Sequence, residues 1–70
     1  MPQSFAEVIG LFGGPAAFSR EIDMPLTAAK QAHIRDSLNA RWFSATARAA
    51  KRKGLPIDER ILALIAEQHG

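Results

Sequence analysis

The stretch PAAFSREIDMPLTAAKQAHI, residues 15–34, decides the fold of this 70-residue chain, because it holds two short helical patterns joined by a turn. Pro15 suits the first turn of a helix, where its missing N–H would have had no partner. Phe18 and Ile22 follow one turn apart and give this pattern an apolar stripe. We therefore predict a helix over residues 15–22.

The turn after this helix is set by an aspartate and a proline. Asp23 tolerates left-handed backbone, and Pro25 prevents the first helix from continuing. Met24, between them, is then expected to point inward. A second, alanine-rich helix is predicted over residues 26–34.

A further helix is predicted before this pair. Ser4 can cap it, with Glu7 three residues later as the capping-box partner. Apolar residues then recur at helical spacing up to residue 12. Gly13 and Gly14 end the pattern.

Two more helices are predicted after the pair. Asn39 can cap a helix that reaches Lys53 and closes at Gly54, with a basic last turn that suits the negative end of the helix dipole. The acidic pair Asp58 and Glu59 then opens the last helix. No alternating β-branched run indicates a strand. The sequence thus predicts an all-α fold, a compact bundle of about five short helices that contains a helix-turn-helix.

The chain is short enough to form one domain, residues 1–70, which would bury only about 60% of the surface that its unfolded form exposes. Association with a second copy would add burial, and the C-terminal segment, residues 55–70, carries an apolar stripe that could serve both as core and as dimer seam. The residues of this predicted seam are Ile57, Ile61, Leu64 and Ile65.

Charge is distributed unevenly along the chain. The stretch from Pro15 to Lys53 holds eight of the nine Lys and Arg residues but three of the seven acidic ones. The residues after Gly54 are net acidic. A basic centre favours a polyanionic partner, although a solvated charged face without a ligand gives the same pattern.

Other classes of protein are disfavoured by what the sequence lacks. No paired carboxylates, nucleophile with a base, or phosphate loop occurs, so we do not expect an enzyme. The two histidines stand far apart and there is no cysteine, so no metal or cofactor is expected. No apolar run approaches the length of a membrane span, and no signal peptide is evident. We expect a cytoplasmic, nucleoid-associated protein with no membrane partner and no small-molecule substrate.

Residues 12–25, FGGPAAFSREIDMP, resemble the helix-turn-helix of small Cro-like and lambda-repressor-like phage regulators, including YdaS-like proteins. The resemblance covers roughly residues 8–45 and includes the aromatic pair Trp42 and Phe43, which we expect to anchor the core. It implies that Phe18, Ile22 and Met24 hold the two helices together. It also implies that the residues facing DNA are Leu26, Thr27, Lys30 and Gln31.

Several positions depart from the family pattern. Asp23 stands where the turn glycine is usual, and Ser19 replaces a small alanine at the helix crossing. The segment Ile34-Arg35-Asp36 stands where many relatives have a run of arginines and a glycine. Ala29 and Ala32 replace larger apolar residues, so we expect the helix over 26–34 to pack loosely or to use Ile34 instead.

The chemistry of the side chains supports the same contacts. Gln31 can make two hydrogen bonds to an adenine edge, Lys30 or Arg35 can donate to guanine, and the methyl group of Thr27 can touch that of thymine. The predicted base contacts are Leu26, Thr27, Lys30, Gln31 and Arg35. Phosphate contacts are predicted for exposed cations and for free N–H groups at the start of the helix over 15–22. The predicted phosphate contacts are Gly14, Arg20, His33, Arg41, Arg48, Lys51 and Arg52.

Two functions therefore stay open. The first is a homodimeric transcriptional repressor that binds a palindromic operator in double-stranded DNA through the helix over 26–34. The second is a protein-interaction module, such as an antitoxin-like or inhibitor protein, on the same helical fold.

Overall fold

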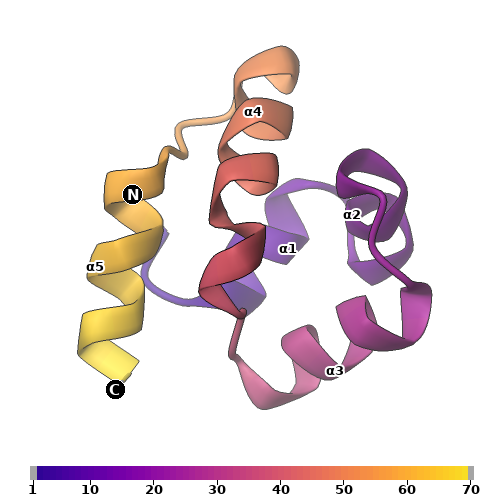
Figure 1. Cartoon of the computed structure of the whole chain (residues 1–70), viewed down its shortest axis with the longest axis horizontal. Coiled ribbons are helices and arrows are strands. Elements are labelled where there is room, and N and C mark those ends of the chain that lie inside the picture. Colours follow the sequence, from indigo (N-terminus) through magenta and orange to yellow (C-terminus); the bar gives the residue numbers. More distant parts are fainter. Residues whose placement is uncertain (1, 70) are drawn as a thin grey trace.

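The computed structural model describes residues 2–69 and shows a small globule with principal extents of 25 × 25 × 19 Å (Figure 1). In chain order the elements are α1 (Phe5–Leu11), α2 (Pro15–Ile22), α3 (Leu26–Arg35), the short 3-10 helix η1 (Ala40–Trp42), α4 (Phe43–Lys53) and α5 (Glu59–His69). These described residues contain no strand, so the all-α prediction is confirmed. The ends of the predicted domain, residues 1 and 70, lie outside the described residues.

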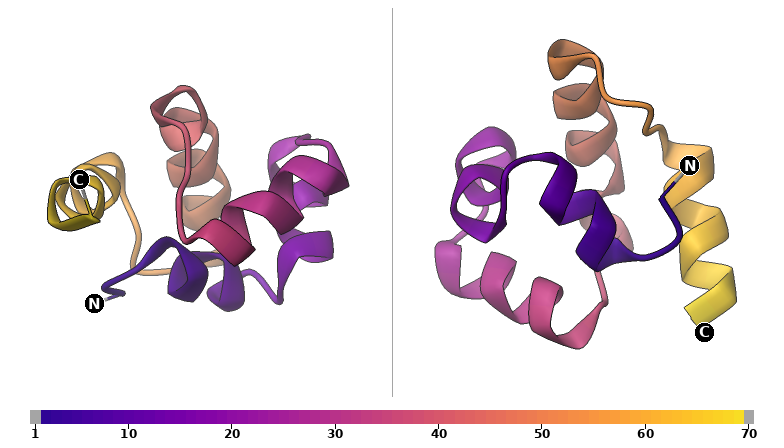
Figure 2. Two further views of the ribbon diagram at one scale, coloured as in Figure 1. Left: turned by 90° about the horizontal axis from the view of Figure 1, so that it is seen from below. Right: turned by 180° about the vertical axis from the view of Figure 1, so that it is seen from behind.

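The helices are arranged around α1 and α4. Figure 1 shows α2 and α3 on one side of this pair and α5 on the other, and the reverse view in Figure 2 agrees. Of all helix pairs, α2 and α3 pack most extensively, while α5 packs against α4. The chain after α3 turns back through η1, so that α4 begins near the end of α3 and runs away from it (Figure 1).

Apolar residues from all five helices form one core. Phe18 of α2 is fully buried and meets the ring of Phe12 edge-on, with centroids 5.1 Å apart. Ile22 and Met24 are also buried, as the sequence predicts. Trp42 and Phe43 are half-buried and pack against this core, and the Phe43 ring stacks on Phe5.

Helix α3 packs through its alanines. Ala29 is fully buried and Ala32 is 8% exposed, whereas Ile34 is 76% exposed. Small side chains allow α3 to approach its neighbours closely, so no larger residue is needed at these positions. The expectation that Ile34 would replace the alanines in the core is therefore wrong.

The turn between α2 and α3 has the predicted left-handed residue. Asp23 adopts φ 57° and ψ 44°, and its N–H caps α2 by donating to the Ser19 carbonyl. Pro25 is extended at the start of α3 and accepts from the N–H of Ala29. The turn thus combines a strained aspartate with a proline that stops α2.

Replacing Asp23 by glycine should stabilise the fold. Left-handed backbone costs an L-residue about 1–2 kcal/mol, and the extra unfolded-state entropy of glycine offsets part of the gain, so Asp23→Gly should add about 0.5 kcal/mol. The β-branched control Asp23→Val should instead cost more than about 1 kcal/mol. Urea unfolding of both variants measures this, and a midpoint for Asp23→Gly below that of the unmodified chain would contradict strain at this turn.

A second aspartate closes α3 in the same way. Asp36 adopts φ 54° and ψ 47°, and its N–H donates to the Ala32 carbonyl. Its Oδ1 also accepts from the N–H of Ala6, at 2.9 Å, in the first turn of α1. Asp36 therefore ends α3 and links that end to the start of α1. The link between the two helices was not predicted from the sequence.

Helix α4 differs slightly from its prediction. Asn39 acts as a cap, since its Oδ1 accepts from the N–H of Arg41, but the first turn is the 3-10 helix η1. Thr46, fully buried inside α4, satisfies its hydroxyl by donating to the Trp42 carbonyl at 2.7 Å. Gly54 ends α4 with φ 70°, as predicted.

Candidate functional site

The predicted base-contacting residues are all exposed on α3, three of them on its outward side and two on its flanks. Helical periodicity places Ala29 and Ala32 against the core, and the opposite side of α3 faces solvent. Thr27, Lys30 and Gln31 are exposed on that side, and Leu26 and Arg35 are exposed on its two opposite flanks. The structure therefore brings Thr27, Lys30 and Gln31 together on one accessible helix surface.

Helix α2 holds α3 in this orientation. Ser19, buried at the packing surface, has a small side chain whose hydroxyl donates to the Ala16 carbonyl at 2.9 Å. The buried serine hydroxyl is therefore satisfied. Met24, in the turn between α2 and α3, is also buried, and this fixes the position at which α3 begins.

The surface of α3 is basic. Lys30, His33 and Arg35 are exposed, and no acidic residue lies between Leu26 and Arg35. Arg41, at the start of the next element, is also exposed, and its guanidinium lies 5.1 Å from the Trp42 ring centroid, a cation–π contact. An anion approaching α3 would therefore meet positive charge on the helix and beyond its C-terminal end.

A shallow hollow of about 240 Å³ lies beside α3. Gln31 and Arg35 line it together with Ser37 and Asn39 from the segment after α3. Ser37 and Asn39 are exposed hydrogen-bonding residues that the predicted contact set omits. Their place directly after α3 was the signal that could have identified them.

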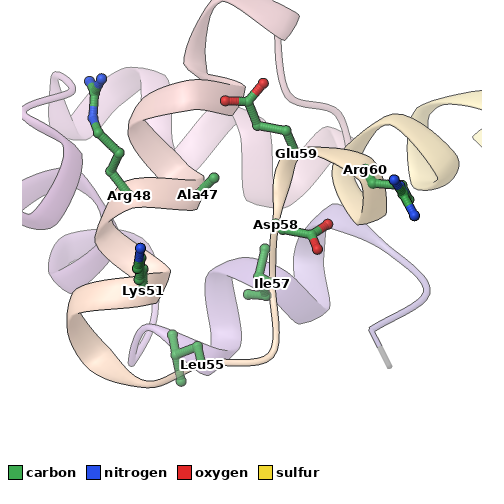
Figure 3. A pocket seen from close by; sticks show the side chains of 8 residues that line it. All are labelled: Ala47, Arg48, Lys51, Leu55, Ile57, Asp58, Glu59 and Arg60. Atoms are coloured by element: carbon green, nitrogen blue, oxygen red, sulfur yellow. The ribbon is translucent and has the colours of Figure 1, made fainter.

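The basic last turn of α4 lies elsewhere. Because α4 runs away from α3, Lys51 and Arg52 stand at its far end (Figure 1). Arg48 and Lys51 line a separate open hollow of about 700 Å³ between α4 and the start of α5, and Asp58, Glu59 and Arg60 also line it (Figure 3). The structure does not bring these three predicted phosphate contacts, Arg48, Lys51 and Arg52, together with α3.

Arg52 is engaged inside the molecule. Its guanidinium donates to the Glu21 carbonyl at 3.0 Å and lies 3.9 Å from the Glu21 carboxylate. Lys53 Nζ lies 3.6 Å from the same carboxylate. These partly exposed contacts join the ends of α2 and α4, and surface pairs of this kind contribute about 0–1 kcal/mol.

The start of α2 offers fewer free donors than expected. Gly14 adopts φ 106° as the N-cap, and its N–H donates to the Ile9 carbonyl at 3.1 Å. Pro15 has no N–H at all. The expectation of a free N–H at Gly14 is therefore wrong. Arg20, on α2, is exposed and could contact a phosphate.

The predicted dimer seam does not form one exposed surface in the structure, where Ile57 lies before α5 and the other three residues lie on it. Ile57 and Ile65 are buried in the core of the single chain, and Ile61 is half-buried. Leu64 is 40% exposed, and Leu62, two residues earlier and on the opposite side of α5, is fully buried in its place. Of the predicted residues, Leu64 and part of Ile61 remain accessible to a second copy.

Comparisons with known proteins add no family to these observations. No protein-family model, curated protein or solved structure matches the chain. None of the helices within residues 2–69 is long and apolar enough to cross a membrane.

Proposed function

We propose that this chain is a sequence-specific DNA-binding transcriptional regulator. In this proposal α2, the turn and α3 act as a helix-turn-helix, and α3 enters the major groove. The observation that supports it best is the outward side of α3, where Thr27, Lys30 and Gln31 are exposed together while the alanines behind them pack into the core. The protein would act on cytoplasmic, nucleoid-associated DNA.

Each exposed residue has a defined task in the proposed complex. Gln31 pairs with an adenine edge through two hydrogen bonds, and Lys30 or Arg35 donates to guanine. Thr27 and Leu26 offer apolar contact at the amino end of α3, which enters a groove first in this kind of docking. These contacts would specify the operator sequence.

A smaller set of exposed side chains would hold the phosphates. Arg20, His33 and Arg41 are exposed on α2, on α3 and just after it. The structure supports these three better than Arg48, Lys51 and Arg52, because the latter lie on α4, away from α3, and Arg52 also pairs with Glu21. Phosphate contacts carry no sequence information but make binding salt-dependent.

Binding to a pool of random duplexes tests the proposal directly. The purified chain is mixed with the pool at low and at moderate salt, and the retained duplexes are sequenced. We expect enrichment of a two-fold symmetric site with half-sites about one helical turn apart, weakened steeply by salt. Weak retention without enrichment at either salt concentration would rule out a sequence-specific DNA reader.

The proposed regulator is a homodimeric repressor whose copies meet through the accessible part of α5. Leu64→Asp should weaken the dimer at least tenfold, because it places a carboxylate in an apolar contact, while leaving the monomer fold intact, since Leu64 is 40% exposed. The matched control is Ala63→Asp, the same charge change at a neighbouring exposed residue. Sedimentation equilibrium over a concentration series measures both variants, and equal weakening by the two, or by neither, would exclude Leu64 from the seam.

A protein-interaction module is the second candidate, and one observation favours it. Leu26 and Ile34 are large apolar side chains exposed on the same helix as the proposed DNA contacts. An antitoxin-like or inhibitor protein would use such residues to hold a protein partner. In that case, partner binding would survive the replacement of Lys30 and Gln31 by alanine.

A further inference from the structure

Ile34 is the most exposed of the large hydrophobic side chains in the described part of the chain, at 76%. It lies seven residues after Thr27 and four after Lys30, so the three side chains follow one stripe along α3. The stripe lies opposite the buried alanines Ala29 and Ala32. Ile34 therefore continues the proposed DNA-reading surface toward the carboxyl end of the helix.

The surroundings of Ile34 favour DNA over an apolar protein surface. His33 and Arg35 flank it, Lys30 lies one turn before it, and α3 contains no acidic residue. A basic rim attracts a polyanion. Among the base edges of the major groove, the apolar group that an aliphatic side chain can contact is the 5-methyl group of thymine.

We propose that Ile34 is a specificity-determining residue that contacts the methyl group of a thymine in each half-site. This inference rests on the proposed function. With a rise of about 1.5 Å per residue, Ile34 stands about 10 Å beyond Thr27 along α3, which corresponds to about three base pairs. The thymine read by Ile34 thus lies about three base pairs from the position read by Thr27, with α3 lying along the groove.

Deoxyuridine substitution tests the contact, because it removes the methyl group and leaves the pairing edge unchanged. Each thymine of the enriched duplex is replaced in turn, and binding is measured for the unmodified chain and for Ile34→Ala. At one position per half-site, the unmodified chain should lose about three- to fourfold in affinity, the amount expected for one buried methyl group. Ile34→Ala should bind the thymine and deoxyuridine duplexes equally at that position.

Two further variants make the test selective. Thr27→Ser removes the other methyl group on the stripe. This variant should still lose affinity when the thymine read by Ile34 is replaced by deoxyuridine. Ile34→Val shortens the side chain by one carbon, so deoxyuridine substitution at that position should still cost this variant part of the affinity that the unmodified chain loses. Because Ile34 is so exposed, urea unfolding of its variants should match that of the unmodified chain.

The outcomes separate this inference from the proposed function. An enriched duplex whose deoxyuridine losses are the same in the unmodified chain and in Ile34→Ala overturns the role of Ile34 alone. An enriched duplex without any deoxyuridine effect does so as well. Failure to enrich any duplex overturns the proposed function and the Ile34 contact with it.

Discussion

Phe18→Ala is expected to destabilise the chain by about 3–5 kcal/mol at 25 °C. The Phe18 side chain is fully buried between α2 and its neighbours and meets Phe12 edge-on. Removing a buried phenylalanine ring costs about 3–5 kcal/mol. A chain of this length has a total stability of about 4–10 kcal/mol, so the loss removes much or all of it.

Urea unfolding followed by far-UV circular dichroism measures this effect, with the fluorescence of the single tryptophan, Trp42, as a second probe. Leu11→Ala is the matched control, because Leu11 is also an apolar helical residue but is 44% exposed. The control should cost less than about 1 kcal/mol. A Phe18→Ala variant as stable as the Leu11→Ala control would show that Phe18 does not anchor the core.

The helix boundaries could be predicted because local chemistry sets them. Pro15 and Pro25 fix where α2 begins and where it cannot continue, and Asp23 supplies the left-handed residue between them. Gly54 ends α4 by the same physical rule. These signals act within a few residues of the chain, so they can be read without knowledge of the tertiary contacts.

The orientation of α5 could not be predicted in the same way. Ile61, Leu62, Leu64 and Ile65 are all apolar, so periodicity permits more than one buried stripe. Packing against α4 selects Leu62 and Ile65 and leaves Leu64 exposed. The choice between these stripes depends on the neighbouring helix.

Polar contacts between residues far apart in the chain could not be predicted from the sequence either. The bond from the Ala6 N–H to Asp36 joins residues thirty positions apart, and that between Arg52 and Glu21 joins residues thirty-one apart. In the sequence, Arg52 is one cation in a basic run that suits the end of any helix. Its pairing with Glu21 becomes visible only once α2 and α4 lie together.

The two aspartates at the ends of α2 and α3 stand where the proposed family pattern would have glycine. In that pattern residue 23 would be the turn glycine, and residues 34–36 would be arginines and a glycine. Both aspartates adopt left-handed backbone, the conformation that glycine enters most readily. The backbone geometry expected of a glycine is therefore kept at both positions by a residue that tolerates it at some cost.

The double variant Lys30→Ala, Gln31→Ala should abolish selective binding to the enriched duplex. Both side chains are exposed on α3, and a good bidentate base contact is worth about 1–3 kcal/mol of discrimination, so losing two should weaken specific binding by about a hundredfold or more. Binding to random duplexes should fall only slightly, since Arg20 and Arg41 still hold phosphates. Fluorescence anisotropy with both duplexes at fixed salt measures the ratio.

The matched control replaces Lys51 and Gln3, an exposed cation at the far end of α4 and an exposed glutamine before α1, by alanine. It removes the same charge and the same kind of amide from positions outside α3 and outside α5, which carries the proposed dimer seam. Selectivity should then persist, because general electrostatics change equally in the two double variants while base contacts are lost in one of them. Equal loss of specific binding in both variants would mean that net charge, and not the outward side of α3, governs recognition.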